Sequence, residues 1–221
     1  ELDEKGNRLG GTVIRFSPEL KTKGQISEEI GRVMAKVGRY CAERKKPLIM
    51  EDLDTTLAKH GMKYGCKKKN RHASLFAYRK MTACLENQAY KQSFGIYKIN
   101  PAYTSQMGKF LYLRPLGLSI HEAASYAIGL KGMGIREKLL PDERLLALLP
   151  EKTKEKLKNG TDIVSIIPAW KHLTKAFRGV SPHSFYRELP YEVLEERKKG
   201  TLKSIASEMK KWTQNNRYEY A

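Results

Sequence analysis

The sequence has 221 residues, 40% of them hydrophobic and 30% charged, and this balance indicates a globular protein rather than a disordered chain. Its 42 Lys and Arg outnumber its 24 Asp and Glu. The formal net charge of +18 favours a polyanionic partner such as nucleic acid over a neutral small molecule. No apolar stretch approaches the roughly 18 residues of a membrane span, so we expect no membrane partner.

The cysteines indicate the redox compartment of the protein, and the first residues bear on where the chain begins. Cys41, Cys66 and Cys84 form no CxxC pair, so we expect neither a zinc ribbon nor a disulfide framework, and this sparse, odd set is typical of the reducing cytoplasm. The start of the chain is acidic and polar, unlike a signal peptide. Because it opens on Glu1 rather than Met, at what resembles the end of a strand, we expect a part of a longer protein.

The first 134 residues alternate between predicted strands and helices, after a turn at residues 5–7. Runs of β-branched and apolar residues predict the strands, and apolar residues at helical spacing predict the helices. Strands that alternate with helices indicate an α/β fold with a mixed or parallel sheet flanked by helices. The expected strands are 11–16, 48–50 and 95–99, and the expected helices begin near residues 27, 74 and 119.

The composition changes after Ile135, where the pattern becomes helical throughout, with Pro or Gly between several segments. We therefore expect two parts, an α/β domain over residues 1–134 and a helical C-terminal appendage over residues 135–221. The sequence leaves the role of the appendage open. Its expected helices are 136–149, 151–158, 162–177, 184–199 and 202–213.

The segment with the clearest chemistry is Leu48-Ile49-Met50-Glu51-Asp52-Leu53-Asp54, in which acidic residues follow a short apolar run. Such a run is typical of a buried strand, and ligands of α/β sheets bind at the carboxyl ends of strands. A carboxylate held there can bind a hard divalent cation through oxygen, and paired ions promote phosphodiester cleavage. The alternative is a solvated turn that happens to be acidic.

A second polar segment, residues 100–106, follows the expected strand at 95–99. Tyr103, Thr104 and Gln106 are of the types that contact phosphates or base edges. An ordinary strand exit capped by hydroxyl groups accounts for the same residues without a ligand.

A third segment begins the helix expected near Ser119. Small residues in it allow the helix to press against a sheet, and His121 and Glu122 lie in its first turn. They are candidate ligands near the strand ends. The alternatives are a capping or packed His and a Glu that stabilises the helix start.

Residues 55–85 contain six Lys, two Arg and two His and no acidic residue. We expect a mobile nucleic-acid-binding loop over residues 59–72, because cations without compensating acids attract phosphates. The alternative is a merely solvated charge run. The candidate contacts are Lys59, Lys63, Lys67, Lys68, Lys69 and Arg71.

In their order and spacing, these segments resemble the RuvC-like nuclease half of the TnpB (OrfB) proteins. These are transposition-associated proteins of insertion sequences and are distant relatives of the type V CRISPR effector nucleases. The resemblance covers residues 1–134. It rests on a Gly-Asn turn at residues 6–7 and on four motifs, MEDLD, SLFAYRKM, GIYKINPAYTSQMG and GLSIHEAASYAIGLKGMG.

The resemblance implies a ribonuclease H-like fold and RNA-guided cleavage of DNA that depends on Mg²⁺, with DNA and a guide RNA as partners. It assigns the family's central-strand Glu to Glu51 and places the first Asp upstream of Glu1. Two features depart from the family: no CxxC ribbon follows Gln106, and Ile120 stands where many members have a third Asp. Glu122 or His121 could replace that ligand, Glu122 being preferred because Mg²⁺ favours anionic oxygen.

Two functions follow. The first is a metal-dependent DNA endonuclease that uses Glu51, an upstream Asp, and Glu122 or His121. The alternative is a catalytically incomplete RuvC-like module that binds RNA and DNA without cutting, which the missing third Asp and the strong basicity favour.

Overall fold

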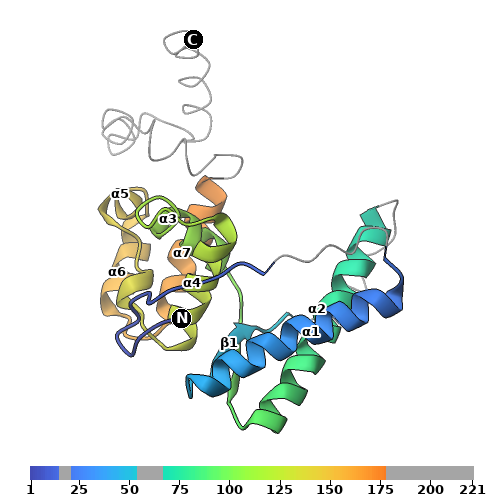
Figure 1. Ribbon diagram of the computed structural model, residues 1–221. Coiled ribbons are helices and arrows are strands. Elements are labelled where there is room, and N and C mark those ends of the chain that lie inside the picture. Colours follow the sequence, from blue (N-terminus) through green and yellow to red (C-terminus); the bar gives the residue numbers. More distant parts are fainter. Residues whose placement is uncertain (15–20, 54–66, 178–221) are drawn as a thin grey trace, which may run out of the picture. The chain divides into compact units, whose positions relative to one another are not determined.

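The computed structural model describes residues 1–14, 21–53 and 67–177, with the backbone alone over residues 67–76 (Figure 1). These residues form two compact units. We call the part within residues 12–100 the sheet unit, and the part made of residues 1–11 and 101–177 the helical unit. Among the described residues, no helix is long and apolar enough to cross a membrane.

The sheet unit is a mixed α/β structure with parallel strands, as the alternating pattern predicted. Strands β1 and β2 pair in parallel, with Leu48 opposite Ile96 and Glu51 opposite Ile99. The strands expected at 48–50 and 95–99 are therefore confirmed. In chain order the elements are α1 (Lys23–Glu43), β1 (Leu48–Glu51), α2 (Lys67–Gln92) and β2 (Ile96–Ile99).

Helix α1 begins four residues earlier than the sequence predicted. Its N-cap is Thr22, whose hydroxyl accepts from the Gln25 N–H at 3.3 Å, while the Gln25 side chain accepts from the Thr22 N–H at 2.9 Å. This capping box satisfies backbone groups at the helix start, so it outcompetes Ser27, which has acids but no reciprocal partner after it.

The core of the sheet unit lies between its helices and one face of the sheet. Ile30, Val33 and Met34 of α1 are buried against Leu85 of α2, as the helical stripe in the sequence predicted. Alternate strand residues pack against this cluster, which is the expected period of two along a strand. These strand residues are Leu48, Met50 and Ile96.

Two expectations about the sheet are corrected. The strand predicted at 11–16 does not form over residues 11–14, where Val13 and Ile14 are 50% and 43% exposed, and its remaining residues lie outside the described part. A β-branched run becomes a strand only where another strand pairs with it. The sheet in the described residues has two strands, so the ribonuclease H-like form of the fold stays a prediction.

The helical unit contains seven helical segments within its described residues. Its main core cluster includes Met107, Phe110 and Leu130 as well as Trp170 and Leu173, and so contains residues from both sides of the boundary expected after residue 134. The segments are α3 (Thr104–Leu111), α4 (Ile120–Gly132), η2 (Glu137–Leu139), α5 (Glu143–Ala147), α6 (Glu151–Asn159), η3 (Val164–Ile166) and α7 (Ile167–Ala176).

The single helix predicted over 136–149 is wrong, because the segment is divided. A 3₁₀ turn ends before Pro141, and α5 then begins after its N-cap Asp142, whose carboxylate accepts from the Leu145 N–H at 2.9 Å. Proline cannot donate the backbone hydrogen bond that a continuous helix needs there. The Trp170 indole N–H donates to the Leu139 carbonyl oxygen at 2.9 Å. This bond gives a partner to a carbonyl group at the point where the helix is interrupted.

The first residues of the chain are held against α4 in the helical unit. Leu2 and Arg8 form an antiparallel bridge, closed by the turn that the sequence predicted. Gly6 has a φ of 69°, and a Cβ there would lie 2.5 Å from the Ile135 side chain, so the turn requires glycine. The Tyr126 hydroxyl donates to the Gly6 carbonyl oxygen at 2.8 Å.

Candidate functional site

The carboxyl ends of the two parallel strands lie at one edge of the sheet. β1 ends at Glu51, opposite Ile99, the last residue of β2. Backbone pairing continues one residue further, because the Asp52 N–H donates to the Ile99 carbonyl oxygen at 2.7 Å. Glu51 and Asp52 therefore leave the sheet from fixed backbone, at the kind of edge where α/β proteins bind ligands.

Tyr78 of α2 holds this strand end by two hydrogen bonds. Its hydroxyl donates to the Glu51 carbonyl oxygen and accepts from the Leu53 N–H at 3.3 Å. Both partners are backbone groups, so the bonds fix the direction in which residues 51–53 leave the sheet. Helical spacing along the sequence does not predict these bonds, because their partners lie 25 and 27 residues away from Tyr78.

The Glu51 side chain is half-buried, and burial raises the pKa of its carboxyl group above the ordinary value. Loss of water disfavours the charged form of an acid, which is the direction of this shift. Burial is its only cause, and no positive partner among the described residues offsets it. A cation beside Glu51 would supply the missing attraction.

The sheet unit can provide part of a Mg²⁺ site. Mg²⁺ keeps several water ligands and commonly takes one or two protein carboxylates, so Glu51 fits as one ligand. Asp52 is the next residue of an extended chain and its side chain points to the other side. Within the residues that the structure describes, no three His, Cys, Asp or Glu side chains gather into a metal-binding group.

Lys98 adds a positive charge near the same strand ends. It lies opposite Met50 in the register, and its ammonium group donates to Glu86 of α2 at 2.6 Å. The hydrogen bond to Glu86 raises the pKa of Lys98, and the charge of Asp52 acts in the same direction. The pair is exposed, so its contribution to stability is small.

Glu122, in the helical unit, is engaged as a helix cap. It is the third residue of α4, where Oε2 accepts from the Ser119 N–H at 3.1 Å and from the Ser119 hydroxyl at 2.8 Å. Oε1 lies 3.5 Å from Nη2 of Arg8. The Ser119 hydroxyl, its backbone N–H and the Arg8 charge all lower the pKa of Glu122. Arg8 is a partner that sequence spacing did not reveal.

His121 precedes Glu122 and is exposed on the first turn of α4. The helix start expected near Ser119 is confirmed, with Ser119 as its N-cap. His121 and Glu122 belong to the helical unit and Glu51 to the sheet unit. Their convergence on one ion stays a prediction.

Of the polar residues after β2, Thr104 and Gln106 lie in the first turn of α3, and Tyr103 precedes it. Tyr103 is the N-cap, with a φ of 66°, and is partly buried against the core of the helical unit. Thr104 is 0% exposed, and its hydroxyl donates to the Pro101 carbonyl oxygen at 2.9 Å, so it cannot reach a phosphate in this structure. Gln106 is half-buried on the same turn.

The basic loop expected over residues 59–72 is corrected in its second half. Lys59 and Lys63 lie outside the described residues. Helix α2 begins at Lys67, so its first turns contain Lys68, Lys69 and Arg71 as well. Lys and Arg are good helix formers, and no Gly or Pro follows Gly65 to interrupt them.

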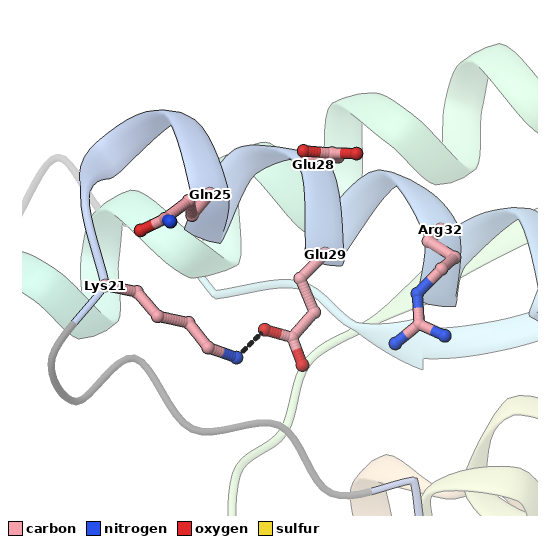
Figure 2. A pocket seen from close by; sticks show the side chains of 5 residues that line it. All are labelled: Lys21, Gln25, Glu28, Glu29 and Arg32. Carbon is pink, nitrogen blue, oxygen red and sulfur yellow. Dashed lines mark hydrogen bonds and ion pairs between the residues drawn. The ribbon is translucent and has the colours of Figure 1, made fainter.

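A hollow on the surface of α1 holds side chains of both charges, as Figure 2 shows. It has a volume of about 590 Å³ and is open to solvent. Lys21 and Glu29 form an ion pair across it. Charges that are neutralised within one exposed helix surface give no directed binding site. The lining residues are Lys21, Gln25, Glu28, Glu29 and Arg32.

No family model, curated protein or solved structure matches this chain.

Proposed function

We propose that this chain is the RuvC-like part of a metal-dependent, RNA-guided DNA endonuclease, in which Glu51 is a Mg²⁺ ligand. The observation that carries the proposal is the Glu51 carboxyl group itself. It is half-buried at the carboxyl end of a parallel strand, its pKa is raised by burial, and no cation among the described residues offsets that burial. A desolvated acid at a strand end is typical of functional sites.

The chain's own residues have defined tasks in this proposal. Glu51 would hold the ion, and a bound Mg²⁺ would supply activation of a water molecule and neutralisation of charge on the departing oxygen. Tyr78 keeps the Glu51 backbone in place through its bonds to residues 51 and 53, so the carboxylate is positioned before substrate arrives. The excess of 18 positive charges over the whole chain attracts the DNA and RNA phosphates.

Cleavage by the full-length protein with its native RNA tests this proposal. Glu51→Gln preserves the shape of the side chain and removes its charge, so we expect cleavage of target DNA in Mg²⁺ to fall roughly 100-fold or more. DNA binding should stay within about twofold, because it depends on Lys and Arg. Glu28→Gln removes an exposed carboxylate of α1 and is the matched control, with cleavage unchanged. Cleavage at the wild-type rate by Glu51→Gln would contradict the proposal.

A second function, binding of RNA and DNA without cleavage, is favoured by the engagement of Glu122. Both of its oxygens already have partners, Ser119 on one side and Arg8 on the other. As a metal ligand it would have to give up the helix cap. A full-length wild-type protein that binds target DNA but leaves it intact in Mg²⁺ and in Mn²⁺ would establish this second function.

A further inference from the structure

Helices α1 and α2 of the sheet unit each end in a turn of the same type. In each turn, one residue of positive φ lies three residues before the strand that follows. The turn residues Lys45 and Ser93 have φ values of 52° and 54°, and β1 and β2 begin at Leu48 and Ile96. In both turns the next N–H reaches back five residues into the helix, which is the Schellman arrangement. These bonds run from Lys46 to the Cys41 carbonyl oxygen (3.1 Å) and from Phe94 to the Ala89 carbonyl oxygen (3.2 Å).

The two turns lie at the same end of the sheet unit. Gly38 of α1 packs so closely on α2 that a Cβ there would lie 2.8 Å from Cβ of Gln88, so the last turns of both helices are in contact. The Leu48 N–H donates to the Gly95 carbonyl oxygen at 2.8 Å and joins the segments that follow the turns. Because the strands are parallel, this end lies opposite the end at Glu51, and the three residues from Leu48 to Glu51 span about 10 Å along β1.

Positive charge gathers at this end. Residues 39–47 and 88–95 contain five Lys and Arg and one acid, Glu43. Four of the five lie in the turns or at the end of α2 and are exposed or half-exposed, namely Arg44, Lys45, Lys46 and Lys91.

Three tyrosine rings accompany these cations at the surface. Tyr90, near the end of α2, is 90% exposed, and Tyr97 of β2 is 59% exposed. The guanidinium of Arg44 lies over the ring of Tyr40, 3.8 Å from its centre, and so forms a flat composite surface. Exposed aromatic rings among cations are the elements on which unpaired bases stack while phosphates are neutralised.

We propose that this end of the sheet unit binds single-stranded nucleic acid. The turn-end surface, as we call it, consists of Arg44, Lys45, Lys46 and Lys91 together with Tyr40, Tyr90 and Tyr97. The cations contact the phosphodiester backbone and the rings stack on bases. A duplex hides its base faces, so the rings give preference to a single strand. The surface shares no residue with the Glu51 site, and the inference goes beyond the proposed cleavage.

Binding of fluorescent 12-nucleotide strands, oligo-U and oligo-dT, to the whole protein tests the charges. The variant Arg44→Ala, Lys45→Gly, Lys46→Ala removes three cations and retains a residue suited to the positive φ at position 45. We expect roughly fivefold or greater loss of affinity near 0.1 M salt, and a slope of log K against log salt reduced by up to about 2. The matched control removes three exposed lysines of α6, Lys152→Ala, Lys156→Ala and Lys158→Ala.

Tyrosine variants test the stacking. Tyr97→Leu and Tyr90→Leu should each weaken binding of the single strand roughly fivefold or more, since one stacked base contributes about 1–3 kcal/mol. Tyr97→Phe keeps the ring and should bind within about twofold of wild type. The same variants should leave binding of a 12-base-pair duplex unchanged, which separates stacking from general charge attraction.

Each outcome decides the proposal. The proposal is supported if the turn variant loses more affinity for the single strand than the α6 control does, and if the tyrosine variants have the expected effects. The tighter binder of oligo-U and oligo-dT then identifies the natural strand as RNA or DNA. Equal loss with both triple variants, or no effect of the leucine variants, overturns it. Glu51→Gln should bind these strands normally, so failure of this inference and failure of the cleavage proposal are distinguishable.

Discussion

The contact between α3 and α4 leads to the sharpest stability prediction, at Gly108. A Cβ on this residue would lie 2.5 Å from the carbonyl carbon and oxygen of Ala123 and 2.6 Å from the Ala124 nitrogen. These are backbone atoms of α4 and cannot rotate away. For ordinary contact at about 3.5 Å, the two helices have to separate by about 1 Å.

Two opposed effects set the change in the free energy of unfolding that Gly108→Ala causes. Overpacking of this kind destabilises by about 3 kcal/mol, whereas the higher helix propensity of alanine stabilises by about 1 kcal/mol. The net loss of about 2 kcal/mol lowers the melting temperature of a unit of this size by about 8–16 °C.

The measurement follows Trp170, which is buried in the helical unit, by fluorescence during thermal unfolding in a Trp212→Phe background. Gly10→Ala is the control, because nothing lies within 4 Å of a Cβ there, and its melting temperature should not change. A Gly108→Ala protein that melts higher than its parent would refute the described packing of α3 on α4, since propensity alone would then decide the result.

Three further predictions concern the sheet unit. Glu51→Gln should raise the free energy of unfolding by roughly 0.5 kcal/mol at pH 7 after allowance for solvent screening. Burial raises the pKa of Glu51, so its charged form destabilises the fold above the ordinary value of 4.5, and denaturant titrations should show the gain vanishing below that pH. Ser93→Gly should stabilise by about 0.5–1 kcal/mol in the same titrations, because glycine adopts the φ of 54° without strain; an unchanged midpoint would argue against that conformation. Tyr78→Phe should cost about 1 kcal/mol and accelerate amide hydrogen exchange at Leu53, whereas unaltered exchange would mean that the hydroxyl does not clamp the strand end.

The sequence was most informative where local signals agreed with long-range packing. The apolar run before Glu51 predicted β1, since a strand buried against helices needs apolar residues whatever its neighbours are. The helix expected from about Ser119 is confirmed, and the capping box that the structure shows at its start is a local feature, complete within four residues. The secondary structure of the two elements that carry the candidate ligands could therefore be predicted from the sequence.

The failures occurred where distant partners decide the outcome. Val13 and Ile14 have strand propensity but no strand to pair with in the described residues. Thr104 is of a phosphate-binding type, yet it is buried with its hydroxyl turned to Pro101. The ion pair of Glu122 joins residues more than 100 positions apart, and no pattern along the chain encodes it.

The helical unit is discontinuous in sequence, which has a consequence for how it folds. The bond from Tyr126 to Gly6 spans 120 residues, and the whole sheet unit lies between its partners. Closing so long a flexible loop costs roughly 4 kcal/mol of chain entropy, which must be met before the first residues can dock on α4. If the sheet unit folds first, it replaces most of that flexible chain by rigid structure. Refolding should then show docking of residues 1–8 as the slow, late step. When the sheet unit unfolds, the contact of residues 1–8 with α4 should be the first part of the helical unit to loosen.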